Sequence, residues 1–135
     1  MNTLLKTEVT ALAKELTPYA VSIRHEIHEH PELGLKEYNT TEIVKRELNK
    51  IGAEILDLGL KVGCVALIHG TKTGKGKVIG LRADMDALPM NDLSGKPWSS
   101  KVDGVAHTCG HDAHTACLLA AAKALMDNRD KFCGT

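Results

Sequence analysis

An alanine-rich run near the end of the chain constrains the fold more than any other feature. Its apolar residues recur at helical spacing, and small side chains set so closely are typical of a helix buried against other elements. They are Ala116, Leu118, Leu119, Ala121, Ala122, Leu125 and Met126. Asp112 precedes the run and can accept backbone N–H groups as its N-cap. The sequence therefore predicts a buried helix that begins near Asp112.

Two further helices are predicted in the first half of the chain. Residues 8–30 carry apolar side chains at roughly helical spacing, with Pro18 either kinking the helix or starting a second segment. Asn39 and Glu42 form a capping-box pattern ahead of the next apolar face. Gly52 then ends this second helix, since glycine is a common C-terminal stop.

Short runs rich in Ile, Val and Leu follow the second helix and predict three strands. They span Ala53–Leu58, Gly63–His69 and Lys77–Ala83, and the glycine-rich loop Gly70–Gly76 is expected to be an exposed hairpin turn. That loop lacks the glycine spacing and the helix that a phosphate-binding loop requires. The order of elements predicts the α/β class, with a mixed sheet flanked by helices.

Length and composition limit the classes of function. The 135 residues, 43% hydrophobic and 25% charged, suit one modest domain. Lys+Arg and Asp+Glu number 17 each, so no basic excess favours nucleic acid as a partner. Charged residues interrupt Met1–Leu16, and no run approaches the about 18 apolar residues of a membrane span. We therefore expect a cytoplasmic protein without a signal peptide, a membrane segment or bound nucleic acid.

The run His107–Thr115 concentrates metal-binding chemistry at the start of the predicted third helix. Cys109 and His111 can aim a thiolate and an imidazole at one point, and both are good ligands for zinc and related metals. A helix N-terminus also favours the ionised thiolate that binds metal. Cys64 and Cys117 lie in apolar runs and are expected to be reduced, buried residues. Two ligands are too few for a catalytic metal, so further ligands must come from elsewhere.

Two nearby pairs of polar residues, one of two aspartates and one of an aspartate with a histidine, admit a structural or a functional interpretation. Asp84 and Asp86 follow a predicted strand, where carboxylates either form a turn or bind and orient metal ligands. Asp112 could serve only as a helix cap, and His114 could pack or orient a neighbour. Cys109 and His111, which lie one loop further along the chain, favour the functional interpretation of the first pair.

The remaining histidines have ordinary explanations. His25, His28 and His30 lie at the end of the first predicted helix, where imidazoles interact favourably with C-terminal carbonyl groups. His25 and His28 could share a helical face, and a metal-binding role for them is the less favoured alternative. His69 ends a predicted strand and has no evident partner.

Four ordered segments resemble the metallo-amidohydrolase family that contains aminoacylases and zinc-dependent carboxypeptidases, and in particular its hippurate-hydrolase branch. The segments are Arg24–Gly34 with Glu37, Leu81–Pro89, Gly104 leading into His107, and Cys109–Ala116. Each segment is moderately specific, but their order and spacing over most of the chain make the combined resemblance strong.

The resemblance implies a zinc-peptidase-like catalytic domain that hydrolyses the amide bond of N-acyl amino acids with two divalent metal ions. Cys109 and His111 are carried over as metal ligands, and Asp86 matches the family's acidic residue beside the metals. Zinc, manganese, cobalt and nickel all suit such ligands. A glutamate acts as general base, and Asp84, Asp112 and His114 are expected to support the ligands. Small N-acyl amino acids are the implied substrates, and the full-length protein is expected to be a homodimer or a higher oligomer.

Relatives of this family are much longer, which changes what we expect of this chain. Residues 1–135 correspond to the N-terminal portion of the catalytic domain, without the lid and dimerisation domain, the general base and the remaining metal ligands. We therefore expect the chain alone to be inactive. A non-catalytic metal-binding or regulatory fragment is the alternative. A thiol redox protein using Cys109 is disfavoured, because the chain has no Cys-x-x-Cys pair.

Overall fold

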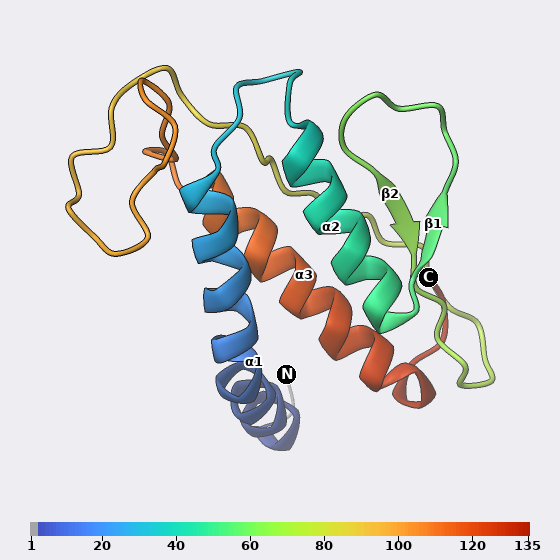
Figure 1. Ribbon diagram of the computed structural model, residues 1–135. Helices are drawn as coiled ribbons and strands as arrows, with labels where there is room; N and C mark the ends of the chain where they lie inside the picture. Colours follow the sequence, from blue (N-terminus) through green and yellow to red (C-terminus); the bar gives the residue numbers. More distant parts are fainter. Residues whose placement is uncertain (1–2) are drawn as a thin grey trace.

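The computed structural model describes residues 3–135 (Figure 1). These residues form, in chain order, α1 (Thr3–Glu29), α2 (Tyr38–Ile51), β1 (Glu54–Leu56), β2 (Val65–Leu67), α3 (His111–Asp127) and the short 3-10 helix η1 (Arg129–Lys131). The predicted α/β class and all three predicted helices are confirmed. Met1 and Asn2, at the start of the segment considered for a signal peptide, lie outside the described residues. Pro18 lies within α1, which continues through it as one helix.

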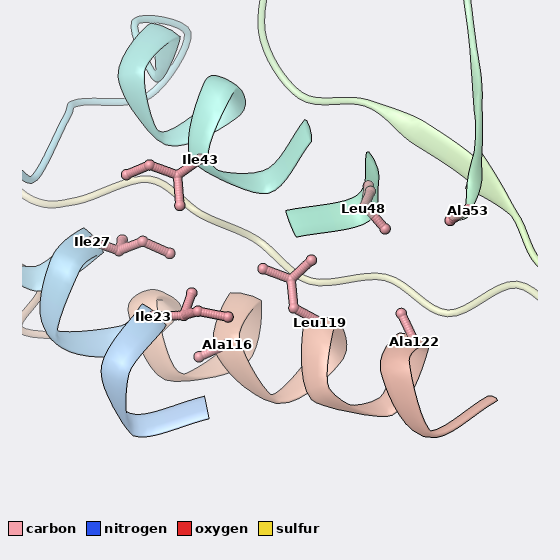
Figure 2. Close-up of a cluster of buried hydrophobic side chains, with 8 residues drawn as sticks. All are labelled: Ile23, Ile27, Ile43, Leu48, Ala53, Ala116, Leu119 and Ala122. Atoms are coloured by element: carbon pink, nitrogen blue, oxygen red, sulfur yellow. The ribbon is translucent and has the colours of Figure 1, made fainter. Parts of the chain in front are cut away.

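The alanine-rich helix α3 is the centre of the packing, as its composition predicts. It lies against both α1 and α2, while the two strands lie beside α2 (Figure 1). Small side chains on α3 let the larger side chains of the other two helices approach it closely (Figure 2). The buried cluster comprises Ile23, Ile27, Ile43, Leu48, Ala53, Ala116, Leu119 and Ala122.

The start of α2 differs from the predicted capping box. The helix begins at Tyr38, so Asn39 lies inside it, and neither Asn39 nor the N-cap residue Glu37 caps it with a side-chain hydrogen bond. Instead, the carboxylate of Glu32 accepts hydrogen bonds from the backbone N–H groups of Asn39 (2.9 Å) and Thr40 (2.7 Å). A carboxylate from the preceding turn thus supplies the acceptor that the sequence pattern assigned to the helix itself. The predicted stop at Gly52 is confirmed, since this residue has a left-handed φ of 77°.

The sheet is smaller than predicted. β1 pairs with β2 in antiparallel register, with Glu54 opposite Leu67. The prediction of a third strand over Lys77–Ala83 is wrong. Within residues 3–135, this segment forms only an isolated parallel bridge between Lys77 and Gly134. The loop Gly70–Gly76 is accordingly not a hairpin turn, since the N–H group of Gly70 donates to the carbonyl of Gly134. Apolar residues on both faces of the segment would need cover on both sides, which residues 3–135 do not provide.

Among residues 3–135, none of the helices combines the length and the apolar character that crossing a lipid bilayer would take.

Candidate metal centre

The segment of residues 84–88 holds its carboxylates against the start of α3. The N–H group of Ala87 donates to the carbonyl of Glu32, and Leu88 pairs with Ala106. On the other side, the hydroxyl of Thr115 in α3 donates to the carbonyl of Asp84 (3.0 Å). These contacts fix residues 84–88 between two parts of the fold, so that Asp84 and Asp86 face the first turn of α3.

His111 is the best-oriented ligand candidate. Its Nδ1 lies 2.9 Å from Oδ1 of Asp86 and 3.1 Å from the carbonyl of the same residue. With Nδ1 donating to these oxygens, Nε2 keeps its lone pair. Metal-binding histidines are usually held in this way, with the second nitrogen bonded to a carboxylate or a carbonyl. The side chain of His111 is partly buried, which restricts its motion further.

Asp84 and His114 complete a compact group with His111. Nδ1 of His114 lies 2.7 Å from Oδ1 of Asp84, and Nε2 of His111 lies 3.7 Å from Oδ2. The two imidazole rings stack with centroids 5.5 Å apart. The hydrogen bond from His114 lowers the pKa of Asp84, so this carboxylate is charged at neutral pH.

The donor set of this group fits a divalent metal. Asp84, His111 and His114 each offer one ligand atom, and these atoms all lie within 4.8 Å of one another. Carboxylate oxygen and imidazole nitrogen are ligands that zinc, manganese, cobalt and nickel share. Among residues 3–135, this is the one such group of three donors.

Cys109 lies just before α3 and is exposed. Cys117 on α3 is exposed as well, so its predicted burial is wrong, whereas Cys64 is partly buried. Cys109 is separated from His111 by Gly110, whose left-handed φ of 90° turns the backbone into the helix. The thiol does not belong to the group formed by Asp84, His111 and His114. Its assignment as a metal ligand therefore stays a prediction, as do the assignments of His111 and Asp86.

Asp112 does not cap α3, and the capping interpretation is wrong. The helix begins at His111, with Gly110 as N-cap and no capping side chain. The fully buried Asp112 points at α1, where Oδ2 accepts hydrogen bonds from Nε of Arg24 (3.0 Å) and Nδ1 of His28 (2.7 Å). Burial raises the pKa of Asp112, but the hydrogen bonds from these two residues outweigh it, so the pKa lies below its ordinary value.

The histidines of α1 have more specific partners than helix-end carbonyls. His28 is buried, and its second nitrogen, Nε2, lies 3.2 Å from Oδ2 of Asp92. His25 stacks on Trp98, with ring centroids 4.0 Å apart. Sequence reasoning missed both contacts. The one available signal was the spacing of Arg24 and His28, which are four residues apart and can share one carboxylate on one helical face.

His107 is a second buried imidazole beside the candidate metal centre. Its ring centroid lies 6.1 Å from that of His28. Burial lowers the pKa of His107, which favours the neutral ring. Within residues 3–135, neither of its ring nitrogens has a hydrogen-bond partner, and the same holds for Oδ1 of Asp112.

Comparison with known proteins identifies similar sequences. The model of peptidase family M20/M25/M40 matches residues 80–135. Thermostable carboxypeptidase 2 of Saccharolobus solfataricus is 46% identical over 122 residues, covering 90% of this chain and 30% of that protein. N-acetyl-L-cysteine deacetylase of Bacillus subtilis is 42% identical over 126 residues, covering 93% and 29%. Hippurate hydrolase of Campylobacter jejuni is 48% identical over 103 residues, covering 76% and 26%.

Solved structures agree with the sequence comparison. A Bacillus subtilis protein described as a dinuclear metal binding peptidase from the M20 family superimposes with a TM-score of 0.80 at 43% identity, covering 86% of this chain and 32% of that one. A putative aminohydrolase from methicillin-resistant Staphylococcus aureus gives a TM-score of 0.82 at 34% identity, covering 96% and 34%. The chain thus spans about a third of the length of the proteins that it matches.

Proposed function

The chain belongs to peptidase family M20/M25/M40, and from this premise we propose that it supplies part of a metal centre that hydrolyses the amide bond of N-acyl amino acids. The observation that carries the proposal is the imidazole of His111, which Asp86 orients so that Nε2 faces Asp84. An orienting carboxylate of this kind has its clearest use when the free nitrogen binds a metal.

The residues would divide the work as follows. Cys109 and His111 would hold a divalent metal, and Asp86 would fix the tautomer and the angle of the His111 ring. Asp84 and His114 would add an oxygen and a nitrogen on the same side. Bound divalent ions supply Lewis-acid chemistry, since they polarise the amide carbonyl and lower the pKa of water.

The names of the relatives support N-acyl amino acids as the substrate class. They include deacetylases of N-acetylcysteine, a hippurate hydrolase and hydrolases of amino-acid conjugates in Arabidopsis thaliana. A centre with two metal ions is supported by the dinuclear structural neighbour. Zinc, manganese, cobalt or nickel as the metal, a cytoplasmic location and a homodimer or higher oligomer of the full-length protein stay predictions.

A chimera tests this function directly. In N-acetyl-L-cysteine deacetylase, the 126 matching residues are replaced by the corresponding part of this chain. We expect metal-dependent release of acetate from N-acetylcysteine, which His111→Ala abolishes, while His69→Ala, an exposed histidine outside the metal centre, leaves it unchanged. A folded, metal-loaded chimera that hydrolyses equally well with His111→Ala would contradict the proposal.

A second candidate function is a non-catalytic metal-binding module. It is favoured by one observation: the described residues already bring Asp84, His111 and His114 together. This candidate expects the chain to bind zinc or manganese, and it expects a well-folded chimera to lack hydrolysis. Calorimetric titration of both proteins with each metal, combined with the acetate assay, separates the two functions.

A further inference from the structure

We propose that His28 is a positioning residue that joins the start of α3, which carries the candidate ligand His111, to the loop of residues 92–101. The consequence for metal binding rests on the function proposed above. The mechanical connection does not, because it follows from hydrogen bonds between α1, α3 and the loop.

The imidazole of His28 bridges two carboxylates from distant parts of the chain. Nδ1 lies 2.7 Å from Asp112 on α3, and Nε2 lies 3.2 Å from Asp92 at the start of the loop. His28 is only 8% exposed, and the two acceptors are 7% exposed or less at their side chains. Each ring nitrogen lies within hydrogen-bond distance of a different carboxylate, so a single buried ring serves both elements.

The contact between His28 and Asp112 lies next to the candidate metal centre. Asp112 follows His111 directly in the first turn of the helix. Because its carboxylate is anchored to α1 by His28 and Arg24, the rotation of this turn is fixed. The direction of the His111 side chain depends on that rotation. A more mobile first turn should therefore hold Nε2 less precisely toward the metal site.

On the other side of the His28 ring, the contact anchors a loop that is already organised around Asp92. The carboxylate of Asp92 accepts hydrogen bonds from the N–H groups of Ser94 and Ser100, both at 2.8 Å. The end of the loop is held to α1 as well, since the N–H group of Lys101 donates to the carbonyl of Glu29. Trp98, the one tryptophan of the chain, stacks on His25 and therefore reports the docking of this loop.

Two substitutions of His28 separate its two contacts. An asparagine amide places a donor near the position of Nδ1, and a glutamine amide places one near Nε2. His28→Asn should keep the bond to Asp112 and release Asp92, whereas His28→Gln should do the reverse. His30→Asn and His30→Gln are matched controls, because His30 is exposed at the same end of α1. Circular dichroism confirms that each variant is folded.

Three measurements on the 135-residue chain report on the two contacts of His28: Trp98 emission for the loop, and amide hydrogen exchange and Co²⁺ affinity for the start of α3. We expect His28→Asn to shift the Trp98 emission to the red, while Co²⁺ affinity and amide hydrogen exchange in residues 111–115 match the His30 controls. We expect His28→Gln to leave the emission unchanged, to speed that exchange, and to weaken Co²⁺ binding about 10- to 100-fold.

The outcomes separate this inference from the proposed function. If both His28 variants match the His30 controls in emission and exchange, or if each variant changes both sides equally, the positioning role is wrong. If the emission and exchange effects separate as expected but the unsubstituted chain does not bind Co²⁺, the positioning role stands and metal binding by this chain is contradicted.

Discussion

Replacing Asp112 with asparagine tests how strongly the contact between α1 and α3 depends on one buried charge. The carboxylate is fully buried and accepts two hydrogen bonds from cationic or ring N–H donors, one from Arg24 and one from His28. Each such bond is worth about 1.5–3 kcal/mol, and breaking a buried pair costs about 3–5 kcal/mol. The side chain of Arg24 is 43% exposed, so water replaces part of its contribution. We therefore expect Asp112→Asn to lower the free energy of unfolding by about 3 kcal/mol, at the low end of that range.

Urea denaturation followed by circular dichroism measures this loss. With a slope of about 1.5 kcal/mol/M, the midpoint should fall by about 2 M. Asp127→Asn is the matched control, because this half-exposed carboxylate pairs with Lys123 at the other end of the same helix and should cost about 0.5 kcal/mol or less. If the midpoint of Asp112→Asn falls no further than that of the control, the buried network does not stabilise the packing of α1 on α3.

The same substitution has a defined pH dependence. The pKa of Asp112 in the folded chain lies below its ordinary value of 3.8. Its contribution is therefore fully present above about pH 5 and is lost as the pH falls through the depressed pKa. The stability difference between the unsubstituted chain and Asp112→Asn should shrink steadily as the pH falls from about 5 toward 2. A difference that stays constant over this range would refute the assigned charge state.

Four further outcomes follow from the same structure. Leu119→Ala removes a buried side chain from the contact of the three helices and should cost about 2–5 kcal/mol in urea denaturation, whereas a cost below about 1 kcal/mol would contradict this packing. Glu32→Ala should cost about 1–2 kcal/mol by leaving the first N–H groups of α2 without an acceptor, and hydrogen exchange should rise at Asn39 and Thr40; unchanged exchange would argue against the cap. Burial raises the pKa of the Cys64 thiol, so mass spectrometry should find it alkylated more slowly than the exposed Cys117 at pH 8, and equal rates would refute this. The 135-residue chain alone should not hydrolyse hippurate or N-acetylcysteine with any of the four metals, and robust metal-dependent turnover would overturn that expectation.

Local patterns in the sequence predicted the helices well. The apolar spacing of α3 and the left-handed glycine after α2 both depend on neighbours within a few residues. The cap of α2 was mispredicted because its acceptor, Glu32, lies outside the helix and reaches back to Asn39. The segment Lys77–Ala83 was mispredicted for a related reason, since a strand exists only when a partner pairs with it.

The candidate site was predictable in its residue types but not in its connections. The carboxylates at Asp84 and Asp86 and the imidazole of His111 were singled out, and the fold brings them together. The hydrogen bond between His28 and Asp112 joins residues 84 positions apart, and no local sequence pattern predicts such a contact. Whether these two side chains meet depends on the angle at which α1 crosses α3, and this angle is known only from the packed structure.

The exposed segment of residues 77–83, which forms no strand, also affects how the chain behaves in solution. Val78 is 85% exposed and Ile79 is 69% exposed on an extended stretch, which is the kind of surface that templates pairing between molecules. The flanking cations Lys77 and Arg82 oppose this association by repelling the same stretch on a second molecule. Salt screens that repulsion over about 8–10 Å at moderate ionic strength. Colloidal stability of the chain should therefore fall as salt and protein concentration rise, and dilute solutions at low ionic strength keep it dispersed.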